Sequence, residues 1–142
     1  VGESGLNGAV CGHFDVPALM VSGDQTVCAE VKDWFGEVES AVVKKATSRF
    51  AAECLPPSQS QILIEQAAFR AVSRLKAGTA PQPLTLSSPI TLVVEFNQSE
   101  MADRTLTLPG ARRLQDRRVE YQAPDMVTIY YAFRTLLSLA RG

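Results

Sequence analysis

Apolar residues in the first part of the chain recur at spacings that alternate between those of helices and those of strands. The elements that this pattern predicts are, in order, a helix at residues 3–14, a strand at 17–21, a helix at 24–35 and a strand at 38–43. Leu6, Val10 and Phe14 form the apolar stripe of the first helix. Its glycines oppose helix formation, so we expect another element to pack closely against it or to use its backbone.

A polar, alanine-rich segment around residues 44–54 leads to a long helix, which Ser58 is suited to cap and which ends near Lys76. The expected apolar face of this helix consists of Ile62, Ala68, Ala71, Val72 and Leu75. Residues 77–89, rich in Pro and Ser, form the clearest loop. The elements predicted beyond it are a strand at 90–96, a short helix at 99–104, a hairpin of 112–114 with 118–122, and a last helix that Pro124 opens.

This order of elements predicts the fold class. Strands alternate with helices in the first half, and a hairpin precedes the last helix, which together indicate an α/β layered domain with a mixed β-sheet flanked by helices. A length of 142 residues favours a single domain, residues 1–142, with residues 77–89 as a surface loop.

Composition excludes several classes of function. A net charge of −1 provides no basic surface for nucleic acid, and no apolar run approaches the roughly 20 residues that span a bilayer. The arginines between residues 112 and 118 indicate the solvated face of a hairpin. The three cysteines, Cys11, Cys28 and Cys54, are widely spaced in apolar or alanine-rich stretches, so we expect reduced thiols that behave as small hydrophobic groups, in a cytoplasmic protein.

The single histidine, His13, limits the possible catalytic sites. Zinc motifs with two histidines need a second one, and a serine triad would have to use His13 itself. The glycines near the start fit neither dinucleotide nor phosphate-loop motifs. The chain begins with Val1 rather than Met, which indicates a processed N-terminus or a part of a longer protein, and Val1 cannot serve as an N-terminal nucleophile.

Glu3 is the carboxylate that the pattern leaves most open. It stands at the start of the glycine-rich helix, with Gly2 and Gly5 beside it and with Asn7 one turn further on the same face. It can be a first-turn acid that interacts with the helix dipole, or a carboxylate that a metal ion or substrate can approach closely.

Other polar residues have structural interpretations that compete with functional ones. Asp24 and Asp125 are suited to start helices. Glu95, inside an apolar strand, is either buried with a partner or directed to solvent. Lys44 and Arg49 follow a strand end, where α/β sheets often bind ligands, although structural pairing is the simpler interpretation.

Several blocks of the sequence resemble the C-terminal half of the DppA-type D-aminopeptidases, a family of zinc metallopeptidases. The most specific block is GESGLNGAVCGHFDVPALMVSGD at residues 2–24. Further blocks lie at 41–57, 94–103, 108–112 and 119–134, so the resemblance extends over nearly the whole chain. The family often reads Gly-Asp-Asp where this chain has Gly23, Asp24 and Gln25, a departure that bears on a helix cap more than on catalysis.

The resemblance implies that two zinc ions are held mostly by residues of an N-terminal half, and that Glu3 is the ligand from the second half. Asn7 would orient that carboxylate or line the pocket. No catalytic residue is expected in this chain, since the family's acid/base histidine lies in the N-terminal half. The implied partners are the N-terminal half, short peptides with an N-terminal D-amino acid, and further copies of the protein in a ring-forming oligomer. The isolated chain is expected to be inactive.

Two other functions remain open at this point. The chain can be a non-catalytic oligomerisation or peptide-binding domain derived from such an enzyme, in which case Glu3 has no metal to bind. It can also be a generic α/β ligand-binding protein that uses Lys44 and Arg49 for an anion.

Overall fold

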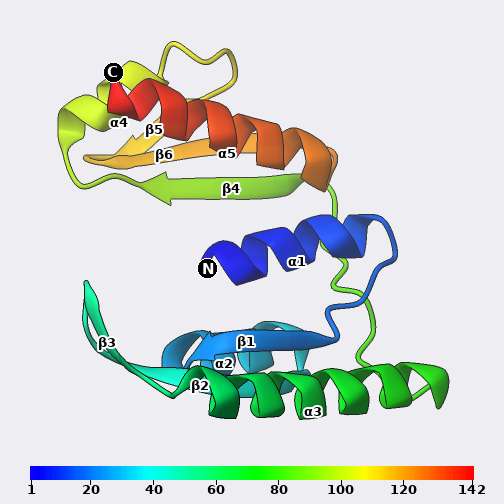
Figure 1. Cartoon of the computed structure of the whole chain (residues 1–142). Helices are drawn as coiled ribbons and strands as arrows, with labels where there is room; N and C mark the ends of the chain where they lie inside the picture. The colour runs from blue at the N-terminus through cyan, green and yellow to red at the C-terminus, as the bar shows by residue number, and fades with distance from the viewer. The chain divides into compact units, whose positions relative to one another are not determined.

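The computed structural model describes residues 1–142, which divide into two compact units, Val1–Thr85 and Leu86–Gly142 (Figure 1). The boundary lies inside the Pro- and Ser-rich loop at residues 77–89. The α/β class is as predicted, but the single sheet that we expected is replaced by two three-stranded sheets, one in each unit. The loop therefore connects two separate layered units, whereas we expected a surface loop within a single domain.

The first unit contains six elements: α1 (Glu3–His13), β1 (Met20–Asp24), α2 (Gln25–Phe35), β2 (Glu39–Ser48), β3 (Ala51–Cys54) and α3 (Pro57–Lys76). Its strands lie in the order β1-β2-β3. β1 and β2 are parallel, whereas β2 and β3 are antiparallel, so this sheet is mixed, as the sequence predicts.

Helices cover both faces of the β1–β2 part of this sheet. Val21 of β1 packs against Val31 and Phe35 of α2 in one apolar cluster. Glu39, which lies beside Met20 in the neighbouring strand, instead binds Arg70 of α3. Because successive side chains of a strand point to opposite faces, α2 and α3 lie on opposite sides of the sheet.

The glycines of α1 form its buried face. Gly5, Gly8 and Gly12 are buried, and a Cβ on Gly12 would lie only 1.9 Å from the backbone oxygen of Leu84. Close packing thus explains why a glycine-rich helix forms here, as we expected. The predicted apolar stripe is only partly correct, because Leu6 is buried but Phe14 is 62% exposed.

Two predictions about strands were wrong in their boundaries. The first strand is Met20–Asp24 rather than residues 17–21, because its ladder to β2 begins at the pair Met20–Glu39. The second strand, predicted at residues 38–43, is Glu39–Ser48, because the polar segment at 44–54 completes β2 and forms β3 as an antiparallel hairpin. Most of its side chains are exposed on both faces of the hairpin, so they show no apolar alternation.

Helix α3 begins and packs differently from the prediction. Its N-cap is Pro56, and Ser58 lies inside the first turn, where its side chain makes no capping hydrogen bond. The buried residues are Ala67 and Ala71, which lie against the sheet. The remaining members of the predicted apolar face include three exposed residues: Ile62 at 54%, Val72 at 47% and Leu75 at 47%. The exposed surface of α3 therefore includes several apolar side chains.

The second unit contains β4 (Ile90–Glu95), α4 (Ser99–Thr105), β5 (Arg112–Gln115), β6 (Arg118–Ala123) and α5 (Met126–Arg141). Its antiparallel sheet has the order β4-β6-β5, which confirms the predicted hairpin. Its core, between the sheet and the helices, consists of Phe96, Ala102, Val119, Leu136 and Ala140. None of the helices in either unit combines the length and apolar character that crossing a bilayer requires.

Candidate functional site

Helix α1 exposes one polar stripe opposite its buried glycines. Glu3, Asn7 and Cys11 follow each other at four-residue intervals, and all three are exposed. Gly8 and Gly12, which lie on the other side of the helix, pack against Phe35 and Leu84. Since a larger residue would not fit at either position, this contact fixes which face of α1 points outward.

Glu3 occupies the first turn of α1, where the positive end of the helix dipole favours a carboxylate. No other residue in the chain hydrogen-bonds or ion-pairs with its side chain. The residue before it is held in place, since the backbone N–H of Gly2 donates a hydrogen bond to Glu30 of α2. The structure therefore offers a carboxylate that is exposed and unpaired but carried by an anchored helix start.

No cluster of metal-binding side chains forms around Glu3 within the chain. In residues 1–142, no group of three or more His, Cys, Asp or Glu side chains is arranged to hold a metal ion. His13 is exposed, and its ring lies edge-on to Phe14 with 4.9 Å between ring centroids. Asn7 lies one turn from Glu3 on the same face, as the spacing predicts, and its side chain has no partner in the chain.

Asp24 and Asp125 act as helix N-caps, as the sequence predicts. Asp24 Oδ1 accepts hydrogen bonds from the backbone N–H groups of Thr26 and Val27, both at 2.9 Å. Asp125 Oδ1 accepts from the backbone N–H of Thr128 at 2.8 Å. Both carboxylates satisfy backbone donors that the first turn of a helix leaves without partners.

Gln25, at the position where the family often has a second Asp, connects α2 to β2. Its Oε1 accepts a hydrogen bond from the backbone N–H of Ala46 at 2.9 Å, and its Nε2 donates to the oxygen of Ala46 at 3.3 Å. This residue is thus not part of the cap that Asp24 makes. It binds the hairpin where the hairpin begins to extend beyond β1.

Glu95 points to solvent, which resolves the alternative that the sequence left open. Its side chain is 56% exposed and accepts a hydrogen bond from Arg117 at 3.2 Å. Arg118 lies 3.9 Å away from the other carboxylate oxygen. The remaining arginines of this hairpin also pair with acids, Arg112 with Glu120 and Arg113 with Asp103, so the basic cluster is a solvated ion-pair surface.

Neither Lys44 nor Arg49 has an acidic partner in the structure. Both are exposed on the β2–β3 hairpin, and the side chain of Lys44 makes no polar contact within the chain. Arg49 lies at the turn, with its guanidinium carbon 5.5 Å from the ring centroid of Phe50. Arg49 therefore contacts an aromatic ring rather than an acid, and neither residue forms the structural ion pair that the sequence suggested.

One polar cluster of the first unit, around Glu39, was not predicted. Glu39 Oε2 accepts from Arg70 Nε at 2.8 Å and Glu39 Oε1 accepts from Arg74 Nη1 at 3.2 Å. The Arg70 hydrogen bond, with a smaller contribution from Arg74, outweighs partial burial and lowers the pKa of the Glu39 carboxyl. The arginines stand four residues apart on α3, but nothing local in the sequence identifies their partner more than thirty residues away.

The cysteines differ from each other in a way that the sequence does not indicate. Cys28 is 4% exposed, and burial, followed by the nearby charge of Asp24, raises the pKa of its thiol. Cys11 and Cys54 are exposed. All three thiols are free in the structure.

Comparison with known proteins gives one consistent result. Residues 1–135 match the sequence profile of the D-aminopeptidase family. A D-aminopeptidase from Bacillus subtilis (strain 168) is 35% identical over 142 residues, which cover 99% of this chain and 50% of that protein. The solved structure of a Zn-dependent D-aminopeptidase, DppA from Bacillus subtilis, described as a self-compartmentalizing protease, matches with a TM-score of 0.88 and 36% identity. The match covers 99% of this chain and 51% of that chain, so this chain spans about half the length of the relatives that it matches.

Proposed function

The chain belongs to the D-aminopeptidase family, and on this basis we propose that it forms the C-terminal portion of a zinc-dependent aminopeptidase. This enzyme would hydrolyse short peptides that begin with a D-amino acid. The observation that carries the proposal is Glu3, an exposed carboxylate without a partner in the chain, at the anchored start of α1. Glu3 lies in the block at residues 2–24, at the position where the family resemblance implies a zinc ligand.

The chemistry of Glu3 fits a role as one zinc ligand among several. Zinc accepts Asp and Glu oxygens together with His and Cys, and a catalytic zinc usually has three protein ligands. A carboxylate that already had a strong partner would have to lose it before binding a metal, but Glu3 has none. The other ligands, and the histidine that acts as acid or base, would come from the N-terminal half.

When bound, a zinc pair would supply Lewis-acid activation of water and of the scissile carbonyl. The residues of this chain would contribute by positioning. Glu3 would bind a zinc ion. Asn7, one turn along the same exposed face, would orient that carboxylate or contact the peptide. The close packing of Gly8 and Gly12 would keep this face of α1 directed outward, because α1 cannot rotate without a clash.

Further parts of the proposal concern assembly, partner and location. One of them is described as self-compartmentalizing, which supports a homo-oligomer for this protein as well. The N-terminal half of the same protein would be its principal partner, and the isolated chain would be inactive. We place the protein in the cytoplasm, where its free thiols would remain reduced.

The test compares this chain alone with the same chain joined to the N-terminal half. Metal content is measured by atomic emission, and release of D-alanine from a D-Ala dipeptide is followed with and without added zinc. We expect zinc binding and hydrolysis only in the joined protein. Hydrolysis by the chain alone would contradict the expected inactivity of the isolated chain. A joined protein that neither binds zinc nor hydrolyses the peptide would contradict the proposal and favour the non-catalytic domain.

A further inference from the structure

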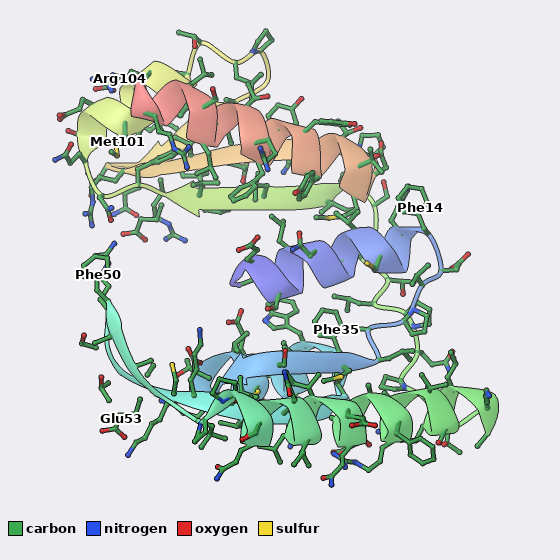
Figure 2. All side chains as sticks on the ribbon, in the orientation of Figure 1. Phe14, Phe35, Phe50, Glu53, Met101 and Arg104 are labelled. Atoms are coloured by element: carbon green, nitrogen blue, oxygen red, sulfur yellow. The ribbon has the colours of Figure 1, made fainter.

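The β2–β3 hairpin ends in an aromatic side chain that the rest of the chain leaves uncovered. Phe50 is 91% exposed, and it lies at the turn between Ser48 and Ala51, where the two strands are paired (Figure 2). Arg49 lies beside its ring and has no acidic partner. We call Arg49 and Phe50 together the hairpin knob. It is an apolar ring with one unpaired positive charge.

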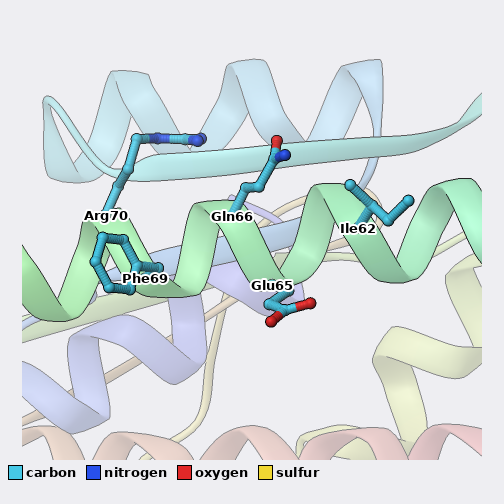
Figure 3. A pocket seen from close by; sticks show the side chains of 5 residues that line it. All are labelled: Ile62, Glu65, Gln66, Phe69 and Arg70. Atoms are coloured by element: carbon cyan, nitrogen blue, oxygen red, sulfur yellow. The ribbon is translucent and has the colours of Figure 1, made fainter.

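A second exposed apolar surface lies on the outward face of α3. Five residues line a shallow hollow there: Ile62, Glu65, Gln66, Phe69 and Arg70 (Figure 3). Ile62 is 54% exposed and Phe69 is 73% exposed, so the two apolar side chains, two helical turns apart, are available for packing. We call this surface the α3 hollow.

The α3 hollow contains one unpaired charge, and its sign is opposite to that of the hairpin knob. Arg70 is not that charge, because it is bound to Glu39, a carboxylate that it shares with Arg74. Glu65 has no hydrogen bond or ion pair in the chain, so it leaves the hollow with one unpaired negative charge. The knob therefore offers an aromatic ring and a cation, and the hollow offers apolar walls and an anion.

We propose that the hairpin knob of one copy of this chain binds in the α3 hollow of a second copy, with Phe50 between Ile62 and Phe69 and Arg49 beside Glu65. Aromatic and arginine side chains in desolvated pockets dominate the energy of most protein interfaces. Both surfaces belong to the first unit. The inference rests on the proposed function only in that it names the surfaces through which the proposed homo-oligomer would assemble.

Sedimentation velocity on the joined, zinc-loaded protein tests this contact. We expect Phe50→Ser and, separately, Phe69→Ser to weaken self-association about 30-fold, as for other hot-spot residues. A mixture of the two variants retains one intact knob and one intact hollow, so it should associate where each variant alone does not. The matched control is Tyr131→Ser, which removes another exposed aromatic residue, 69% exposed on α5, and should leave the mass unchanged.

Charge reversal tests the pairing itself. Arg49→Glu and Glu65→Arg should each weaken association, and the double variant should restore it. Unchanged mass for Phe50→Ser, or a double variant no stronger than the single ones, would overturn the inference. Peptidase activity measured on the same samples separates the two proposals: an active enzyme whose mass does not respond contradicts only the contact, and an inactive protein whose mass responds contradicts only the function.

Discussion

The ring of Phe35 occupies the space into which a side chain on Gly8 would project: a Cβ there would lie 2.1 Å from Phe35 Cζ. Phe35 cannot move aside easily, because it is 7% exposed and packs in a core cluster with Val31 and Val38. The glycine in the middle of α1 is thus required by packing between helices.

We expect Gly8→Ala to destabilise the protein. Alanine is favoured over glycine in a helix by about 1 kcal/mol, but overpacking of a core costs about 1–3 kcal/mol, so packing should prevail. Urea unfolding measures the net effect. Cys11→Ala, on the exposed face of the same helix, is the control and should stay within about 0.5 kcal/mol of the unchanged protein. A Gly8→Ala variant that is more stable would mean that Phe35 repacks freely.

Glu3→Gln should abolish zinc-dependent activity without affecting the fold. The substitution preserves size and removes the negative charge of a side chain that no other residue in the chain binds. Loss of residues that only support a metal ligand already costs about 10–100-fold, so loss of a ligand should lower zinc affinity by about 100-fold or more. Zinc titration and D-alanine release provide two readouts on the joined protein.

The control for this variant is Glu100→Gln, which changes a first-turn acid of another helix, α4. It should retain zinc and activity. Equal zinc affinity in Glu3→Gln and in the unchanged protein would remove Glu3 from the metal site and leave it as a residue that interacts with the helix dipole.

Cys28 should react with thiol reagents only after unfolding. It is buried and its pKa is raised, so both access and the fraction of thiolate are reduced, whereas Cys11 and Cys54 are exposed. In the 142-residue chain, a colorimetric disulfide reagent should detect two fast thiols, and a third on addition of urea. Cys11→Ser should leave one fast thiol. Three fast thiols in the native chain would show that the α2 side of the sheet opens readily.

Features that depend on local chemistry were predictable from the sequence. The caps at Asp24 and Asp125 follow from the ability of a short acidic side chain to accept bonds from the N–H groups just after it. The β5–β6 hairpin and the last helix, α5, follow from regular periodicity. In the candidate site, helical spacing placed Glu3 and Asn7 on one face, but only the family resemblance distinguished Glu3 from an ordinary first-turn acid.

Features that depend on distant parts of the chain were not predictable. The part of the β2–β3 hairpin at residues 44–54 is largely exposed on both faces, so it lacks the alternation by which a strand is recognised. The apolar residues Ile62 and Val72 suggested a buried face of α3, whereas the small side chains of Ala67 and Ala71 make the close contact with the sheet. Side-chain size at a close approach, rather than apolar character, determines which face of this helix is buried.

The Glu39 cluster provides a prediction about pH. The pKa of Glu39 is lowered from its ordinary value of 4.5 in the folded protein, mainly by the hydrogen bond from Arg70. The folded state therefore binds a proton more weakly than the unfolded state. The stabilising effect of the ionised carboxylate is complete above about pH 4.5 and is lost as the pH falls from there through the lowered value.

Glu39→Gln should accordingly destabilise the protein at pH 7 but much less at pH 3. Arg70 is half exposed, so solvent screens the ion pair, and we expect a loss of about 1 kcal/mol at pH 7. Urea unfolding of both proteins at the two pH values measures the difference. Glu53→Gln on β3, whose carboxylate has no partner in the chain, is the control and should cause little change at either pH. A Glu39→Gln effect of the same size at both pH values would mean that packing, and not the charge, connects β2 to α3.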